Sequence, residues 1–358
     1  MCPIIVRLKQ SCDNASWDRY VYDHSEACVY HLSGWQTVIE GAYGHRTYYL
    51  IAEEGEHGAI VGVLPLVHLK SLLFGSHLVS LPFFDIAGVL CDDLHIGVAL
   101  IEEALKLARR LKTQSIELRQ SNSLTEFLSH LEKSDLCVQS ISTKERLLME
   151  LPKTPDSLMS GFKSKLRSQI KSPIKKGLKI RIGGCELLKD FYSIFAVNMR
   201  DLGSPVHSID MMAGVLKTFP EKARVFIVHQ DNRTLACSLA VDFGTLMANP
   251  WASSLRRYRR LNANMLLYWS MLEYAIERGL HCFDFGRSSP DEGTYRFKLQ
   301  WGASPKPTYW YNLSTSDRIA SNASPDKNRF DHLIAIWQKL PVSLTRIIGP
   351  AIRKRISL

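Results

Sequence analysis

The stretch FDFGRSSPDEGTYRFKLQWGA, residues 283–303, crowds together more charged and aromatic side chains than a structural turn needs. Lys298 is a point charge on a flexible stem, which suits it to stabilise an oxyanion or to bind a phosphate. Tyr295 would donate a hydrogen bond to a tetrahedral oxygen, or else only pack against Trp301. No local motif suggests a Ser-His-Asp or Cys-His arrangement, so we do not expect covalent catalysis. The stretch thus predicts a site that positions substrates and stabilises negative charge.

Polar residues also surround the predicted strand at 282–288. Arg287 lies near its carboxyl end and is expected to point towards the cleft in which open α/β sheets bind ligands. Strand alternation places Asp284 on the opposite face from the phenylalanines beside it. Asp284 is therefore either a general base or ligand of an acceptor amine, or one half of an ion pair with Arg287 or Arg296. Trp301 either forms a wall against a sugar or adenine ring or packs in the core.

Two basic segments upstream contain no acidic residue. In residues 161–181, helical spacing would put Arg167, Lys171 and Lys175 on one face, where like charges repel. That face either binds phosphate or RNA or is simply solvated. The second segment, SSLRRYRRLNAN at 253–264, leads into a predicted helix, whose first N–H groups and dipole favour anions. This loop either binds phosphate or is simply solvated. Its phosphate-binding candidates are Arg256, Arg257, Arg259, Arg260, Asn262 and Asn264.

A repeated α/β unit must position these residues. The same order of strands, helix and strand occurs twice, which indicates a tandem duplication. The first copy has predicted strands at 47–54 and 59–69, a helix at 96–112 and a strand at 115–120. The second copy has predicted strands at 223–229, 234–243 and 244–253, a helix at 264–279 and a strand at 282–288.

This order resembles the core of the GNAT acyltransferase fold. The resemblance implies an α/β protein with tandem GNAT-like domains, whose mixed sheets are flanked by helices. It also implies that the phosphates of an acyl donor bind at the loop entering the central helix. The usual glycine-rich motif there, Q/R-x-x-G-x-G/A, is absent from both copies, which disfavours a conventional coenzyme A cradle. We place the domains at 1–150 and 151–314, the latter with the transfer site, and a helical tail at 315–358 docking on the first domain or a membrane surface.

Four motifs resemble the FemAB family of the GNAT superfamily, with its BioF2-like acetyltransferase domain. More narrowly, they resemble the FemAB-like proteins associated with exosortase/PEP-CTERM exopolysaccharide loci. The resemblance implies transfer of an aminoacyl group, in the better-known members from aminoacyl-tRNA, onto an amine of a cell-envelope precursor. The motifs are FKSKLRSQIKSPIKKGLKIRIG (162–183), NMRDLGSPVHS (198–208), PWASSLRRYRRLNANMLLYW (250–269) and the opening stretch.

The same resemblance assigns roles to particular residues. A neutral amine attacks an activated ester in such a reaction, so no nucleophilic side chain is needed, and the FKxxWG lysine, here Lys298, lies near the substrate. Asn198, Arg200 and His207 are expected in a loop that faces the acceptor. His207 is either a proton acceptor at neutral pH or incidental. In the first domain, two residues of the motif YHLSGW line the acceptor groove, namely His31 and Trp35.

Composition restricts the class of protein. A formal net charge of +10 over 358 residues favours an anionic partner, with plain solubility as the alternative. The eight cysteines include no CxxC pair and the twelve histidines no HExxH motif, so we expect neither a disulfide framework nor a metal site. No apolar run is long enough to span a bilayer, and the N-terminus lacks a signal-peptide pattern, which predicts a cytoplasmic protein.

The C-terminal residues 330–358 are apolar with a basic end, a pattern that suits either docking or contact with an anionic membrane surface. We predict a cytoplasmic enzyme, at most peripheral at the inner membrane, that moves an activated acyl group to an amino group of an envelope polysaccharide or lipid-linked precursor. The donor, aminoacyl-tRNA or acyl-CoA, would be a co-substrate, with no tightly bound cofactor. The alternatives are an acyl-CoA-dependent N-acetyltransferase acting on an amino sugar and a non-catalytic scaffold of polysaccharide assembly.

Overall fold

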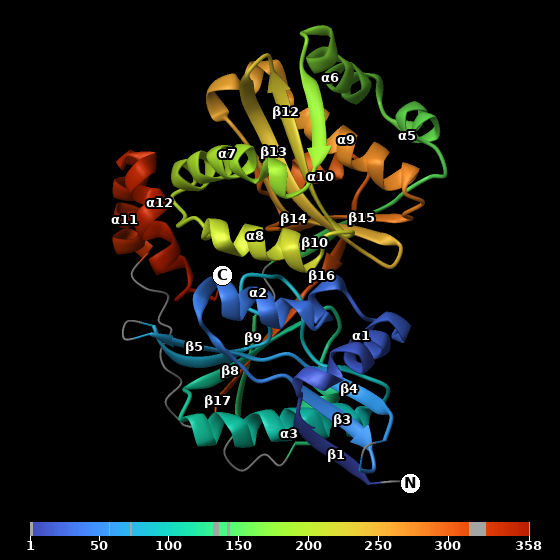
Figure 1. Ribbon diagram of the computed structural model, residues 1–358, viewed down its shortest axis with the longest axis vertical. Helices are drawn as coiled ribbons and strands as arrows, with labels where there is room; N and C mark the ends of the chain where they lie inside the picture. The colour runs from blue at the N-terminus through green and yellow to red at the C-terminus, as the bar shows by residue number, and fades with distance from the viewer. Residues whose placement is uncertain are drawn as a thin grey trace. The chain divides into compact units, whose positions relative to one another are not determined.

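Two units make up the chain in the computed structural model, which describes residues 3–56, 58–71, 74–131, 136–141, 144–314 and 327–357 (Figure 1). The first unit comprises Met1–Thr143, Pro307–Lys327 and Lys354–Leu358. The second comprises Lys144–Lys306 and Asn328–Arg353. Each unit therefore contains segments that are distant from one another in the sequence.

A long helix, α3 (Leu94–Leu111), packs against both sheets of the first unit. It begins at Asp93, whose carboxylate accepts a hydrogen bond from the backbone N–H of Ile96, and it buries an apolar face that includes Leu100 and Ala104. The four-stranded sheet has the order β1 (Ile4–Leu8), β3 (Leu50–Glu54), β4 (Ile60–Leu64), β7 (Leu90–Cys91). The six-stranded sheet has the order β2 (Arg46–Thr47), β5 (Val67–Ser71), β6 (Gly75–Val79), β8 (Ser115–Gln120), β17 (Tyr309–Ser314), β9 (Cys137–Ile141). The shorter helices are α1 (Asn14–Asp23), α2 (Gly34–Tyr43) and α4 (Thr125–Ser129).

The second unit is built on a mixed sheet covered by helices on both faces (Figure 1). Alternate residues of β13 face opposite helices: Ala236 belongs to the core under α9, whereas the thiol of Cys237 contacts the Phe191 carbonyl of α7. The sheet order is β11 (Lys179–Gly183), β12 (Ala223–Gln230), β13 (Arg233–Phe243), β14 (Leu246–Ser254), β15 (Cys282–Ser288), β10 (Glu145–Glu150), β16 (Ser304–Pro307). The helices are α5 (Pro155–Gly161), α6 (Ser164–Lys175), α7 (Leu188–Asp201), α8 (Ile209–Thr218), α9 (Ala263–Glu277), α10 (Gly293–Leu299), α11 (Lys327–Lys339) and α12 (Val342–Arg353).

Each unit contains the crossover that the duplicated pattern predicts. In the first, β6 and β8 are parallel and α3 connects them; in the second, β14 and β15 are parallel and α9 connects them. Almost every residue of α9 from Met265 to Leu272 is buried, so this helix is the central one of its unit. The prediction of tandem GNAT-like units with mixed sheets is confirmed.

Two strands and the tail depart from the predicted domain boundaries. We placed residues 145–150 in the first domain, but β10 pairs with β15 in the second unit. We placed residues 309–314 in the second domain, but β17 lies between β8 and β9 in the first. Such pairings join distant parts of the chain, which a local pattern does not reveal.

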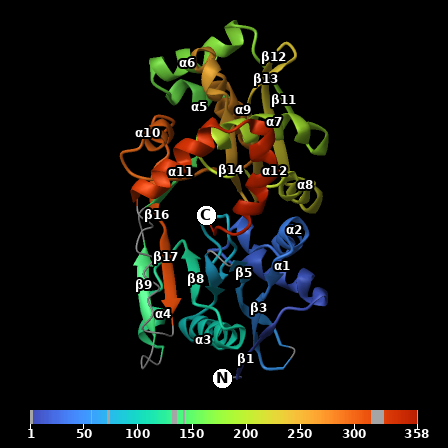
Figure 2. The same ribbon diagram turned by 90° about the vertical axis from the view of Figure 1, so that its left-hand side faces the viewer.

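The tail is helical, as expected, but its helices belong to the second unit, where α12 lies beside α7 (Figure 2). This differs from the predicted docking of the tail on the first domain. Only Lys354–Leu358 belong to the first unit. Part of the predicted tail, residues 315–326, lies outside the described residues. None of the described helices is long and apolar enough to cross a membrane.

Candidate functional site

The parallel strands β14 and β15 separate at a bulge. Within residues 144–314, the last residues of the two strands that pair with each other are Ala248 and Asp284. Immediately beyond it, two residues of β15 lie opposite Leu147 alone on β10, which defines a β-bulge. The second of them, Gly286, has a φ of +71°, a left-handed conformation that glycine adopts without a steric penalty. The bulge therefore turns the backbone of β15 at the point where the two strands part.

Lys298 of α10 is held at this bulge. Its Nζ atom donates to the carbonyl oxygens of Gly286 at 3.0 Å and Arg287 at 2.9 Å. The side chain is buried, and a buried ammonium is costly unless it is hydrogen-bonded. The two carbonyls accept hydrogen bonds from the ammonium, which offsets part of the cost of burying it. The geometry thus holds a positive charge where the strands separate.

Asp284 has a partner that the sequence analysis missed. Its Oδ2 atom accepts from Nη2 of Arg146 at 2.6 Å and from Nε at 3.1 Å, and its Oδ1 atom accepts from the Gly286 N–H at 2.8 Å. The side chains of the pair are only 10% and 5% exposed. Asp284 is therefore in an ion pair, but with Arg146 and not with either proposed arginine. Because it is buried and paired, Asp284 supports the bulge, and its predicted role as a general base does not fit.

Tyr295 also pairs with β10. Its hydroxyl donates to the Glu145 carboxylate at 2.6 Å, and this hydrogen bond raises the pKa of Tyr295. The hydroxyl hydrogen is thus already directed to a carboxylate. Two arginines were predicted near this site. The backbone carbonyl of Arg287 accepts a hydrogen bond from Lys298 at the bulge, whereas Arg296 is exposed on α10.

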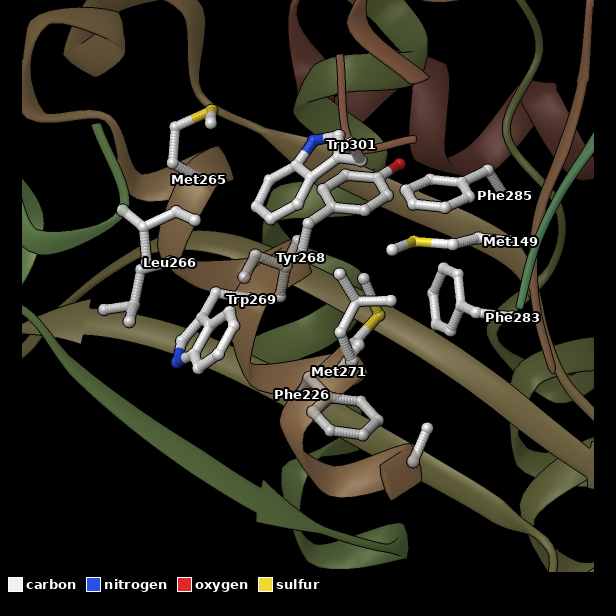
Figure 3. Close-up of a cluster of buried hydrophobic side chains, with 14 of the residues drawn as sticks. Met149, Phe226, Met265, Leu266, Tyr268, Trp269, Met271, Phe283, Phe285 and Trp301 are labelled. Atoms are coloured by element: carbon white, nitrogen blue, oxygen red, sulfur yellow. The ribbon is translucent and has the colours of Figure 1, made fainter. Parts of the chain in front are cut away.

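Trp301 lies in the hydrophobic core, so of its two predicted roles the structure supports packing. The side chain is 1% exposed, and its ring centroid lies 5.6 Å from that of Phe162 and 6.2 Å from that of Tyr268. Figure 3 shows Trp301 in one cluster with Tyr268 of α9 and with Phe283 and Phe285 of β15. These contacts make Trp301 a core residue.

The two basic segments lie side by side. The Nζ atom of Lys176 donates to the Arg260 carbonyl at 2.8 Å, which joins the end of α6 to the 3₁₀ turn Arg256–Leu261. As predicted, α6 is a helix, and it leaves Lys171 and Lys175 exposed. Arg167 is half-buried, and its guanidinium donates to the Ser160 carbonyl at 3.2 Å.

The turn before α9 replaces the expected irregular loop. Its four arginines are exposed, and the guanidinium of Arg257 lies 4.8 Å from the centre of the Tyr258 ring. Asn262 has a φ of +57° at the entrance to α9, and Asn264 follows in the first turn. No side chain caps this helix, so its first N–H groups are suited to bind an anion.

The residues predicted in the acceptor-facing loop have other positions. Asn198 and Arg200 lie in the last turn of α7, where they donate to the Ser253 hydroxyl at 3.0 Å and the Leu340 carbonyl at 2.9 Å. His207 does follow in a loop but is buried, and its Nε2 atom accepts from Nε of Arg353 at 3.1 Å. Burial and the Arg353 charge hold the pKa of His207 well below its usual value. This occupied nitrogen does not fit the role of proton acceptor.

The two candidates in the first unit are both buried. Trp35 has no exposed surface, and its indole N–H donates to the Val29 carbonyl at 2.7 Å, so it is a core residue and not the lining of a groove. His31 lines a cavity of about 50 Å³, room for little more than water. Burial lowers the pKa of His31 to about 4.

Metal ligands are not grouped in the part of the chain that the structure describes: no three His, Cys, Asp or Glu side chains there form a metal-binding cluster. The described cysteines are free thiols.

Residues 163–299 match the family model described as an acetyltransferase (GNAT) domain. The matched range includes both basic segments, the bulge of β15 and Lys298. No match is found among curated proteins. The second unit therefore carries a GNAT-type acyltransferase domain.

Solved structures resemble this chain over most of its length. FemX is 16% identical with a TM-score of 0.67, over 86% of this chain and 96% of that one. A tandem GNAT protein from the clavulanic acid biosynthesis pathway, solved without AcCoA, is 12% identical with a TM-score of 0.56, over 88% and 98%. L-PGS from Bacillus licheniformis is 11% identical with a TM-score of 0.52, over 81% and 86%. These similarities show that the chain has a tandem GNAT-like fold.

Proposed function

We propose that this protein is an acyltransferase that moves an activated acyl group onto an amino group, with Lys298 stabilising the oxyanion. The observation that carries the proposal is the buried Lys298 ammonium, held by two backbone carbonyls where β14 and β15 separate. A preorganised charge in such a site stabilises developing negative charge more strongly than water does. The match of this unit to an acetyltransferase (GNAT) domain supports the same reaction class.

In the proposed step, the neutral amine of the acceptor attacks the carbonyl carbon of the donor. A carbon–nitrogen bond forms as the bond to the donor's leaving oxygen or sulfur breaks. The nitrogen loses a proton, and the leaving group gains one. Because the amine itself is the nucleophile, the protein needs only to position both substrates and stabilise the tetrahedral oxyanion.

Aminoacyl-tRNA is the donor that we favour. The contact between Lys176 and the Arg260 carbonyl joins two exposed basic segments into one surface, which suits a polyanion better than a single pyrophosphate. The absent glycine-rich motif argues in the same direction. Acyl-CoA is the alternative donor, and the description of the matched domain as an acetyltransferase favours it.

The acceptor that we propose is an amine of an envelope polysaccharide or its lipid-linked precursor, in line with the resemblance to the FemAB family. Peripheral contact of a cytoplasmic protein with the anionic inner membrane would suit such an acceptor. Support comes from large apolar side chains that α11 and α12 expose, with Ile347 75% exposed. The others are Leu333, Ile336 and Leu344.

The test is binding of aminoacyl-tRNA and, separately, of acetyl-CoA to the full chain. Replacing all four arginines of Arg256–Leu261 by glutamine should weaken tRNA binding by at least about tenfold and reduce its salt dependence. Lys217→Gln, an exposed lysine on α8, is the matched control. Binding of acetyl-CoA alone would favour the N-acetyltransferase. Binding of neither would contradict the proposal and favour the scaffold.

A further inference from the structure

A cavity of the second unit lies between α5, α6 and the chain that follows α10. Its volume is about 500 Å³, within the range of small-molecule sites. Its floor is apolar, and most of the side chains that form it are buried in the core. The apolar lining residues are Met149, Leu158, Phe162, Leu166, Leu299 and Trp301. A lining of this kind favours a hydrocarbon group over a sugar or a nucleotide base.

The polar side of this cavity carries only positive charge. Lys163 and Lys165 both line it and are exposed, and its lining includes no aspartate or glutamate. The two lysines flank the start of α6, where no side chain caps the helix. The first N–H groups of a helix lack intrahelical acceptors, and its dipole favours negative charge. The cavity is thus apolar inside and attractive to an anion at its edge.

The indole N–H of Trp301 is an independent observation that points to a ligand in this cavity. Its Nε1 atom is buried and has no hydrogen-bond acceptor among the described residues, although the residue lines the cavity. In Figure 3 the indole nitrogen lies at the edge of the aromatic cluster and not at its centre. Buried indole N–H groups usually have an acceptor, so an oxygen of a bound molecule would complete the site.

We propose that this cavity binds a single-chain anionic amphiphile, with the hydrocarbon chain inside and the head group at Lys163 and Lys165. The lining of the cavity does not include Lys298, Gly286 or Arg287, so the cavity is distinct from the proposed transfer site. The proposal is one of binding and does not depend on acyl transfer. A fatty acid and a lysophospholipid share this chemistry, so the experiment must distinguish these two sources.

Isothermal titration of the full chain tests the proposal, with probes below the concentrations at which they form micelles. Dodecanoate represents the fatty acid and lauroyl-lysophosphatidylglycerol the lipid. Dodecyl maltoside has the chain with a neutral head, and acetate and inorganic phosphate have the anion without the chain. We expect saturable binding of one or both anionic amphiphiles, and the tighter of the two identifies the source. Equal binding of dodecyl maltoside, or binding of the short anions with the same affinity, would overturn the proposal.

Two variants locate the site. Gly161 lines the cavity, and a Cβ atom there would meet nothing within 4 Å, so Gly161→Phe should fill the cavity without disturbing the core. It should weaken binding of the anionic amphiphile by at least about tenfold. The double variant Lys163→Gln, Lys165→Gln should weaken it by about three- to tenfold, whereas exposed Lys189→Gln on α7 should not. Unchanged affinity in a folded Gly161→Phe protein, checked by its thermal unfolding, would also overturn the proposal.

Discussion

The two units share one crossover but place different cations at its end. In the second unit, Lys298 donates to two carbonyls of β15 beyond the last β14–β15 pair. In the first unit, β6 and β8 are parallel as far as Val79 and Glu117, and Arg119 follows two residues later on β8. Arg119 is completely buried and Lys298 is also buried, but the two cations have different partners.

Arg119 contacts residues from several segments of the first unit. Its guanidinium contacts the Glu117 carboxylate at 2.6 Å, donates to the Ser357 carbonyl at 2.8 Å, and lies 4.2 Å from the centre of the Trp310 ring. The backbone N–H of Phe83 also donates to the Ser357 carbonyl, at 2.8 Å. The end of the chain thus occupies this position in the first unit. The same topology therefore carries a structural cation, paired with Glu117, in one unit and, in our proposal, a functional cation in the other.

The largest effect on stability should come from Arg119→Met. The change would leave the Glu117 carboxylate and two carbonyls without their donor, so the free energy of unfolding should fall by about 3–5 kcal/mol. Urea unfolding of the full chain measures this, with the exposed Arg46→Met of β2 as the control. A loss below about 1 kcal/mol would show that this cation is not structural.

Lys298→Ala tests the role of the cation that we propose to be functional in the second unit. The rate of acyl transfer should fall by about 100- to 1,000-fold, as when one oxyanion donor is removed. Steady-state kinetics with whichever donor binds checks this, against the exposed Lys189→Ala. Full transfer activity in the folded variant would make Lys298 a structural residue like Arg119.

Truncation after Arg353 should have a smaller effect. It removes the Ser357 carbonyl that accepts from Arg119 and Phe83, and the Lys354 carbonyl that contacts His45 at 2.8 Å. Since each net hydrogen bond contributes about 1 kcal/mol, the free energy of unfolding should fall by about 2–3 kcal/mol. The maximal transfer rate should stay unchanged at a temperature where the truncated chain is folded. A loss of activity without a loss of stability would contradict a purely structural role of these residues.

The smallest effect is a pH dependence that both units share. Burial lowers the pKa of His31 to about 4 and that of His207 well below its usual value. The unfolded chain therefore binds protons more readily, and the free energy of unfolding falls as pH drops below about 6.5. Between pH 7 and 5.5, each histidine should contribute a loss of about 1 kcal/mol.

Urea titrations at several pH values check this. His31→Gln and His207→Gln should each reduce the pH dependence, whereas the exposed His281→Gln should leave it unchanged. An unchanged slope in one of the two variants would show that its histidine protonates freely in the folded state.

Local patterns predicted the helix and the closing strand of each crossover, whereas the strand predicted at 59–69 is two strands, β4 and β5, in different sheets. The strands at 115–120 and 282–288 have the predicted bounds, and the helix before each of them differs by at most two residues at either end. These elements follow from periodic burial along a short segment, which the sequence displays directly. The basic helix α6 was instead expected from the spacing of Arg167, Lys171 and Lys175.

Contacts between distant segments were missed. The partners of Asp284 and Tyr295 are Arg146 and Glu145, which lie 138 and 150 residues away in the chain. They come from β10, which the sequence placed in the wrong unit. A pairing register depends on which strands meet in the folded sheet, and neither residue belongs to a recognisable motif.

The sequence by itself determined the duplicated order of elements, the charge of the segments before α9, and the crowding of charged and aromatic side chains around Lys298. Its periodicity and charge are properties of neighbouring residues, so they can be read without the fold. Only the tertiary structure decided which charges are neutralised. Asp284 meets Arg146, Arg119 meets Glu117, and the Lys298 ammonium meets two carbonyls, because burial and pairing are set by segments that come together only when the sheets form.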